Sequence, residues 1–210
     1  MSEPARTATA NAARERNPRG EGDKLRVELL DAAAELMAEK GDLDAISLRS
    51  IAARAGVSPT AVYGHFDGHL ELLTESVRHC WIEFDRAFDE AEAKVDDPYD
   101  DLRLMGEAYI GFAIGQPGKY HVLFANKIDL QIDGRSVGLH TFDRLVEKVA
   151  RILNDLDDPR DPWFVAVEVF TWIHGIVDLI CRHGDGEWPP IEMLLADLQV
   201  RLGLVRASTD

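Results

Sequence analysis

Few residues of this chain have the types and spacing that metal or acid–base chemistry needs. His174 and Asp178 lie four residues apart on one predicted helix, where they could ligate a metal or orient each other for proton transfer. No third ligand stands at a matching spacing. The acidic run from Asp155 to Asp161 lacks the glycine and the terminal glutamate of a calcium-binding loop. We therefore predict neither a metal site nor a bound cofactor.

Common catalytic motifs are also missing from the sequence. It contains no glycine-rich phosphate loop, no Gly-x-Ser-x-Gly turn and no His-Glu-x-x-His pair. Cys181 and His183 are two residues apart, which places their side chains on different faces of a helix. We predict that the protein is not an enzyme. A helical enzyme that uses His174 and a carboxylate for acid–base work stays open as an alternative.

The composition indicates a folded protein without a disulfide framework. The 210 residues are 46% hydrophobic and 29% charged, enough to bury a core in one domain or in a small and a medium domain. Two cysteines, Cys80 and Cys181, fit a reducing compartment. No apolar signal segment follows the N-terminus, so we expect a cytoplasmic protein.

Apolar residues recur at helical spacing along most of the chain, and strand patterns are nearly absent. We predict an all-α protein of about nine helices with short connections, and a loop over residues 129–134. Residues 1–23 have no apolar periodicity and are predicted to form a flexible arm. The predicted helices cover about residues 24–40, 47–55, 58–66, 68–94, 102–115, 118–126, 136–154, 163–181 and 191–202.

Two short helices near residue 56 have the pattern of a helix-turn-helix. Ser47 and Ser58 are suitable N-caps, and Gly56 allows the left-handed conformation of a sharp turn. Ala52 permits close helix contact, and Val57 and Val62 supply apolar packing. Such a pair can place its second helix in the major groove of DNA. A helical hairpin with no DNA role fits the spacing equally well.

The run SLRSIAARAGVSPTAVYGHF, residues 47–66, resembles the helix-turn-helix signature of TetR-type transcriptional repressors. The resemblance extends over about fifty residues, from Lys24 to Leu73. Trp172-Ile173-His174-Gly175 resembles a Trp-x-His-Gly signature in the ligand-binding domain of one TetR subgroup. This resemblance implies a DNA-binding domain over residues 24–70 and a ligand-binding and dimerisation domain over residues 71–210.

The resemblance also implies which side chains meet a double-stranded DNA operator. Hydroxyls, an imidazole and helix N-terminal amides are suitable partners for phosphates, and small residues let the helix approach the groove. We expect Tyr63 to face DNA and Phe66 to pack in the core. The implied DNA-binding residues are Ser47, Arg49, Ser58, Pro59, Thr60, Ala61, Tyr63, Gly64, His65 and His69.

One position departs from the family pattern. His69 stands where the family usually has a lysine at the start of the fourth helix, and Asp67 precedes it. A neutral imidazole gives a weaker phosphate contact than an ammonium group. Operator affinity is then modest, or the arginines of the N-terminal arm compensate by reaching a neighbouring groove.

The distribution of charge qualifies the overall acidity. A formal net charge of −15 argues against nucleic acid as a partner. However, residues 67–210 carry −14 of it, whereas residues 45–66 contain Arg49 and Arg54 and no carboxylate. We therefore expect the acidic half to face away from DNA, and binding to depend more on shape and base contacts than on bulk charge.

The C-terminal half supplies aromatic and apolar residues for a small-molecule pocket. The helix over residues 163–181 is apolar on more than one face, but Glu168, His174 and Asp178 oppose a membrane span. We expect one face in the core and the other against a second copy. The predicted ligand-binding residues are Met105, Tyr109, Phe112, Tyr120, Phe124, Phe170, Trp172 and His174.

These features together predict a homodimeric repressor that binds a palindromic operator and is released by a small apolar or aromatic effector. The helix over residues 68–94 joins the two halves and is expected to transmit the effector signal. A helical small-molecule sensor without DNA binding is the alternative from the same residues.

Overall fold

The computed structural model describes residues 22–40, 43–92, 95–125, 131–132, 135–184 and 186–206, and most of the predicted arm lies outside them. Nine α-helices occur in this part of the chain, which confirms the all-α prediction. The helices are α1 (Gly22–Lys40), α2 (Leu48–Arg54), α3 (Pro59–Val62), α4 (His69–Glu92), α5 (Pro98–Gly115), α6 (Pro117–Ala125), α7 (Val137–Asp155), α8 (Pro162–Arg182) and α9 (Ile191–Arg201).

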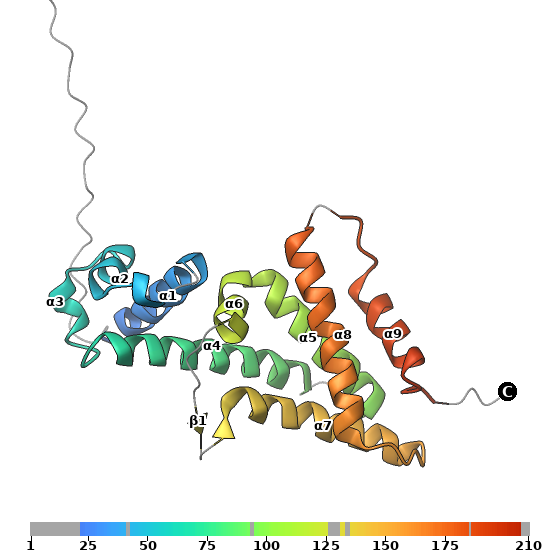
Figure 1. Cartoon of the computed structure of the whole chain (residues 1–210). Coiled ribbons are helices and arrows are strands. Elements are labelled where there is room, and N and C mark those ends of the chain that lie inside the picture. The colour runs from blue at the N-terminus through green and yellow to red at the C-terminus, as the bar shows by residue number, and fades with distance from the viewer. Residues whose placement is uncertain are drawn as a thin grey trace, which may run out of the picture.

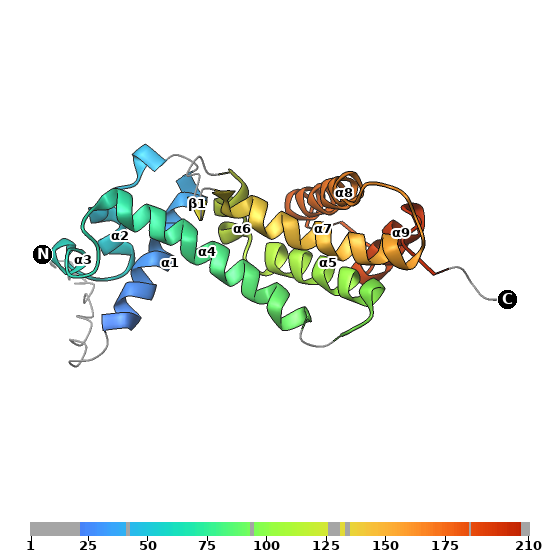
Figure 2. The same cartoon turned by 90° about the horizontal axis from the view of Figure 1, so that it is seen from below.

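The molecule is elongated, with the short helices at one end and the last two helices at the other (Figure 1). Helix α4 has 24 residues and is about 36 Å long, which lets it run from α3 to the larger half of the molecule. It packs against α1, α5 and α6. The view from below shows α4, α5 and α7 running along the length of the molecule (Figure 2).

Two small elements differ from the sequence prediction. A short 3-10 helix, Leu43–Ala45, precedes α2. Strands β1 (Gln131–Ile132) and β2 (Arg135–Ser136) pair antiparallel next to the start of α7, where we expected a loop. Two residues per strand are too few to produce a pattern of alternating polarity, so periodicity could not have revealed this pair.

The core follows the apolar face of α4. Val77, Phe84 and Phe88 on this helix are almost fully buried. The sequence predicts one apolar stripe at helical spacing, made of Leu70, Leu73, Val77, Trp81, Phe84 and Phe88. The prediction for Leu70 is wrong, because its side chain is 73% exposed in the first turn of α4. The rest of this stripe is confirmed and belongs to one continuous core that extends from α1 to α9.

Helix α8 is buried on one side only. Val165, Val169 and Val177 face the core, whereas Phe164 and Leu179 are exposed. By length and composition alone α8 is apolar enough to cross a membrane, and it is the single helix of that kind in the described chain. One of its apolar faces is therefore left uncovered within a single chain.

Candidate DNA-reading surface and effector site

Local hydrogen bonds cap the start of α2, and a glycine with positive φ forms the turn from α2 into α3. The backbone N–H of Ser50 donates to Ser47 Oγ at 3.1 Å, and the backbone N–H of Ser47 donates to Ser50 Oγ at 3.0 Å. Gly56 has φ +70°, which confirms the predicted left-handed turn. Ser58 occupies the N-cap position of α3, but its side chain makes no capping bond, so this part of the prediction is wrong. The Ser58 hydroxyl therefore does not cap the backbone N–H groups at the start of α3.

Side chains on α3 and just after it divide between core and surface. Tyr63 is 62% exposed and Phe66 is 2% exposed, which confirms the orientation predicted for both rings. The other predicted DNA-contact residues of this segment are exposed or half-buried. Ser47, Arg49, Ser58, Pro59, Thr60 and Gly64 are exposed, and Ala61 and His65 are half-buried.

The two arginines of this segment have different surroundings. Arg54 forms ion pairs with Glu35 at 3.0 Å and Glu39 at 2.7 Å, both on α1. These contacts raise the pKa of the Arg54 guanidinium, and Arg54 lowers the pKa of the Glu39 carboxyl. No carboxylate of the described chain pairs with Arg49, which is exposed. Arg49 and Arg54 give residues 45–66 a formal charge of +2, and the ion pairs of Arg54 neutralise half of it. The sequence signal that we missed is the presence of Glu35 and Glu39, four residues apart on one face of α1.

His69 begins α4 in a different environment from a surface lysine. It is half-buried, and its Nε2 atom is buried without a hydrogen-bond partner among the residues placed by the structure. The backbone N–H of Asp67, two residues before His69, donates to the Glu71 carboxylate. A buried Nε2 atom gives no support to the predicted contact between His69 and a phosphate.

The helices that follow α4, here called the sensing half, contain three polar groups inside an aromatic cluster. Tyr109 of α5, Tyr120 of α6 and His174 of α8 converge there, and His174 Nδ1 lies 2.8 Å from the Tyr109 hydroxyl and 3.0 Å from the Tyr120 hydroxyl. The two hydroxyl oxygens are 3.2 Å apart. Asp178, four residues after His174 on α8, accepts a hydrogen bond from Arg182 at 2.8 Å.

Burial keeps these three groups uncharged near neutral pH. Removal from water lowers the pKa of the His174 imidazole, because the charged form is the one that loses hydration. For the same reason, the pKa of Tyr120 is raised to about 12 and that of Tyr109 is also raised. The site therefore presents neutral hydrogen-bonding groups.

Most of the predicted ligand residues gather around this group, with one exception. The rings of Phe124 and Phe170 contact His174 with centroids 4.9 and 5.2 Å apart. Met105 lines a cavity of about 20 Å³ with Tyr109 and Phe170, about the size of one water molecule. Phe112 reaches the cluster through Phe84. Trp172 is partly buried on another face of α8 and makes none of these ring contacts.

Two aromatic residues of α4 complete the cluster and were not predicted as ligand residues. Trp81 and Phe84 contact Phe124, with ring centroids 5.8 and 6.0 Å apart. The sequence showed them only as part of an apolar helical stripe. Their position matters because α4 then touches the cluster directly and also leads to α3.

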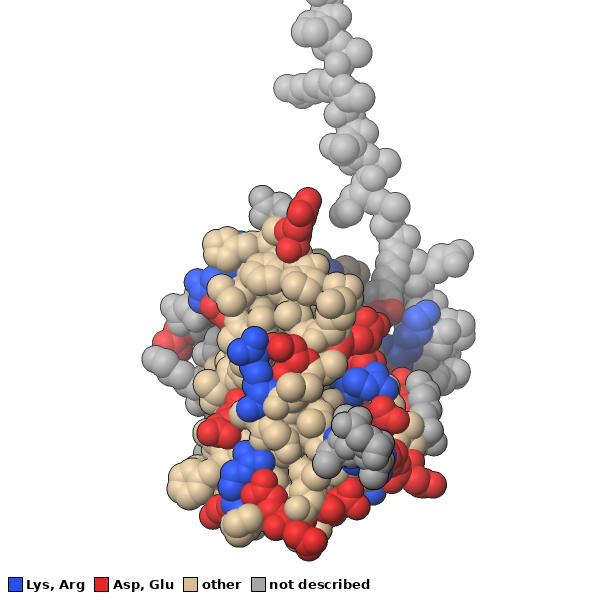
Figure 3. Space-filling view, turned by 90° about the vertical axis from the view of Figure 1, so that its right-hand side faces the viewer, with Lys and Arg blue, Asp and Glu red and all other residues tan. Residues whose placement is uncertain are grey.

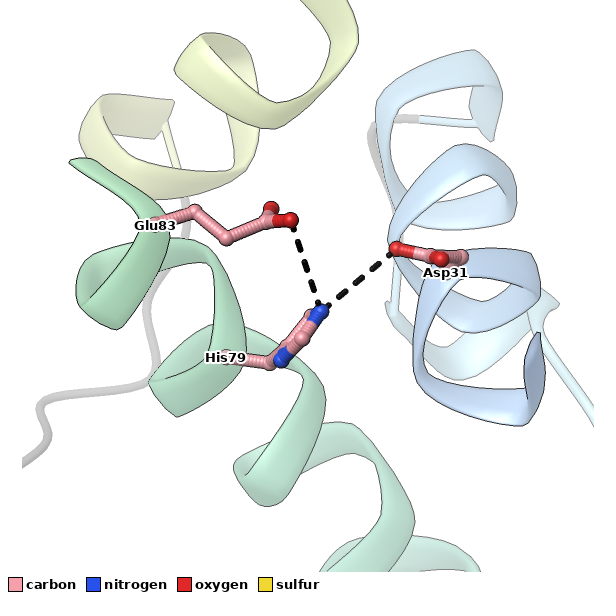
Figure 4. Close-up of side chains that lie close together, drawn as sticks. All are labelled: Asp31, His79 and Glu83. Carbon is pink, nitrogen blue, oxygen red and sulfur yellow. Dashed lines mark ion pairs between the residues drawn. The ribbon is translucent and has the colours of Figure 1, made fainter. Parts of the chain in front are cut away.

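A polar cluster joins α1, α4 and α6 nearby. His79 Nε2 lies 3.7 Å from carboxylate oxygens of both Asp31 and Glu83 (Figure 4). These three residues have the types and spacing of metal ligands. However, the Lys119 ammonium pairs with Asp31 at 2.9 Å and with Glu83 at 2.5 Å. The cluster is therefore an ion-pair network in which lysine supplies the cation.

Two family models match the chain over most of its length. The model described as bacterial regulatory proteins, tetR family, matches residues 29–75. The model described as tetracyclin repressor-like, C-terminal domain, matches residues 102–199. The chain belongs to the TetR family of transcriptional regulators. Members of this family bind DNA through the helix-turn-helix and are not enzymes.

Named relatives match only part of the chain. It is 31% identical over 91 residues to the HTH-type transcriptional regulator BetI of Brucella canis, covering 43% of this chain and 44% of that protein. It is 30% identical over 93 residues to the uncharacterized HTH-type transcriptional regulator YobS of Bacillus subtilis, covering 44% of this chain and 47% of that protein. The chain thus aligns with less than half the length of these relatives.

Solved structures match nearly the whole fold. A TetR-like transcriptional regulator from Rhodococcus sp. RHA1 has a TM-score of 0.68 at 24% identity, covering 89% of this chain and 97% of the other. FadR from Bacillus subtilis, in complex with stearoyl-CoA, has a TM-score of 0.66 at 15% identity, covering 84% and 96%. These similarities show the fold, an N-terminal helix-turn-helix domain followed by a larger helical domain.

Proposed function

We propose that this TetR family regulator is a cytoplasmic repressor that binds a palindromic operator as a homodimer and is released by a small apolar or aromatic effector. The observation that carries the proposal is the position of α4. This helix follows directly after the exposed α3 and contributes Trp81 and Phe84 to the aromatic cluster. A change in the aromatic cluster can therefore move α3 through α4.

The DNA contacts are proposed for the exposed surface around α3, within a DNA-binding domain over residues 24–70. Tyr63 and Thr60 have the exposure and hydrogen-bonding groups to meet bases or flanking phosphates. Arg49 supplies an unneutralised charge for the phosphate backbone. The small side chain of Ala61 and the absence of one at Gly64 allow close approach to the groove.

The second copy is proposed to cover the exposed faces of α8 and α9, within a ligand-binding and dimerisation domain over residues 71–210. Phe164 on α8 and Met193 on α9 are 65% and 64% exposed, and Leu179 and Val200 are exposed as well. Figure 3 looks onto this end of the molecule and shows mostly uncharged surface with scattered charges. Such a dimer must place its two α3 helices about 34–36 Å apart, or a suitable multiple, to meet both half-sites.

Effector release is proposed to work as a population shift. An effector that binds one conformation better than another lowers DNA affinity only by that difference in affinity. The network of Lys119 with Asp31 and Glu83 holds α6 against α1 and α4, so it connects the sensing half with the first helix of the DNA-binding domain. Helix α4 and this network are the two routes by which the aromatic cluster can act on α3.

The experiment that tests the proposed function is selection of genomic DNA fragments by the purified full chain, followed by sequencing and measurement of affinity. We expect a palindromic sequence, and we expect Tyr63→Ala to weaken binding at least tenfold without loss of fold. Deletion of residues 1–20 should weaken binding several-fold if the arm reaches DNA. Absence of any selected sequence would favour a helical sensor without DNA binding, and turnover of a ligand would favour an enzyme.

A further inference from the structure

The Tyr109–Tyr120–His174 group has a donor that it does not use itself. If His174 Nδ1 is the acceptor, Tyr109 donates to it, Tyr120 donates to the Tyr109 oxygen, and the Nε2–H of His174 is left over. If Nδ1 carries the proton, it donates to Tyr109, Tyr109 donates to Tyr120, and the Tyr120 hydroxyl proton is left over. Either tautomer therefore leaves one N–H or O–H free to donate.

The surroundings of this group are mainly aromatic, with Cys181 and the Asp178 carboxylate, which is ion-paired with Arg182, also close enough to act on it. Phe84, Phe124 and Phe170 all have ring contacts with Tyr109. The carboxylate that acts electrostatically on both His174 and Tyr120 is that of Asp178. Within the described ranges, no lysine or arginine hydrogen-bonds to or forms an ion pair with any of the three polar side chains.

These two observations distinguish anionic ligands from neutral ones. An anionic group placed here would lose hydration, gain no cationic partner and lie near the Asp178 carboxylate. A neutral oxygen would lose much less hydration, and it would accept a hydrogen bond from the N–H or O–H that the group leaves free. The aromatic rings favour an apolar body beside that oxygen.

We propose that this site takes an uncharged aromatic or apolar molecule with a neutral acceptor oxygen, such as a ketone, and discriminates against the corresponding carboxylate. Tyr109, Tyr120 and His174 are the specificity-determining residues. The inference rests on the proposed function in taking the aromatic cluster as the effector site. It also requires the cluster to open, because the cavity lined by Met105, Tyr109 and Phe170 is about 20 Å³ in this conformation.

The test uses three probes of similar size, acetophenone, ethylbenzene and benzoate, with the full chain at pH 7 and without DNA. Dissociation constants are measured by ligand-observed NMR up to the solubility limit of each probe. We expect acetophenone to bind about fivefold more tightly than ethylbenzene, the ratio expected for one net hydrogen bond, and benzoate to bind weakest. Benzoate binding as tightly as acetophenone, or no binding of any probe, would overturn the proposal.

Variants assign the preference to the polar group. The ratio between acetophenone and ethylbenzene should fall toward one in the variant that removes the surplus donor. That variant is His174→Phe where the Nε2–H is the surplus donor, and Tyr120→Phe where the Tyr120 hydroxyl is. Phe124→Leu is the matched control and should weaken both probes by the same factor. Retention of the full ratio in both polar variants contradicts the assignment.

A spectroscopic readout in the unaltered chain does not depend on how the variants fold. In protein labelled with ¹⁵N-histidine, acetophenone should shift the His174 nitrogen resonances, and ethylbenzene should shift them much less. Equal shifts with both probes count against hydrogen bonding at this group. Because no DNA is present, a ketone preference with no effect on operator binding would reject the proposed effector role and leave the ligand class standing.

Discussion

The Arg54 guanidinium on α2 is held by the Glu39 carboxylate on α1 through two hydrogen bonds, Nη1 to Oε1 at 2.9 Å and Nη2 to Oε2 at 2.7 Å. This paired geometry directs the arginine charge toward the first helix of its own domain. Arg54 thus fixes α2 against α1, while Arg49, five residues earlier, keeps an exposed charge that we propose for DNA. The two arginines of α2 differ because carboxylates of α1 pair with Arg54, whereas Arg49 is exposed to solvent.

Arg49→Ala should weaken operator binding and change its dependence on salt. Each phosphate contact that is lost removes about one unit from the slope of log K against log[salt] for each protomer. Arg54→Ala is the matched control, and its slope should stay close to that of the unaltered chain because its charge is already neutralised. Fluorescence anisotropy over a range of salt concentrations measures both slopes. Equal slope changes in the two variants would show that Arg54 also contacts phosphate.

Gly56→Ala should destabilise the protein by about 1–2 kcal/mol, because the left-handed conformation is unfavourable for any residue with a Cβ atom. A Cβ atom at Gly56 meets nothing within 4 Å, so the cost comes from the backbone alone. Gly111→Ala, in the middle of α5 with equally open space, is the matched control and should stabilise by about 0.5–1 kcal/mol. Urea unfolding measures both changes, and the same sign for both would contradict this explanation.

The sequence predicted the helices well because each carries its own apolar periodicity, cap or stop signal. Ser47 and Gly56 act within a few residues of their position, so local rules identify them. The start of α5 was missed, because Asp97 caps a helix that begins at Pro98, four residues before the predicted start. The ring of Tyr63 could also be placed, because the helix-turn-helix pattern fixes which side of α3 is outside. Local structure and one exposed surface were therefore predictable.

Contacts between distant segments were not predictable in the same way. Nothing in the spacing of Arg54 or Lys119 shows which carboxylates lie opposite, since their partners are on α1 and α4. The convergence of Tyr109, Tyr120 and His174 depends on how three helices pack. The sequence could name aromatic residues as candidates, but it could not separate these three from Trp172.

Asp101→Leu should destabilise the protein by about 3 kcal/mol. The Asp101 carboxylate is nearly fully buried and accepts hydrogen bonds from Lys148 at 2.8 Å and Arg151 at 2.9 Å. Removal of the carboxylate deprives a buried ammonium of this partner, which costs more than the ion pair itself contributes. The double variant Asp101→Leu/Lys148→Met should recover a large part of the loss. Denaturant unfolding gives both values, and a double variant less stable than Asp101→Leu contradicts the argument.

Mild acid should reduce the stability of the unaltered chain more than that of His174→Gln. Burial lowers the pKa of His174 in the folded protein below the value near 6.5 that it has when unfolded. As the pH falls through 6.5, the unfolded chain therefore takes up a proton before the folded one, and the free energy of unfolding decreases by at most about 1.4 kcal/mol per pH unit. Above this range both states are neutral at His174, and the contribution is fully present. Urea unfolding at pH 7.5 and 5.5 measures the effect, and an identical pH dependence in His174→Gln would show that other groups cause it.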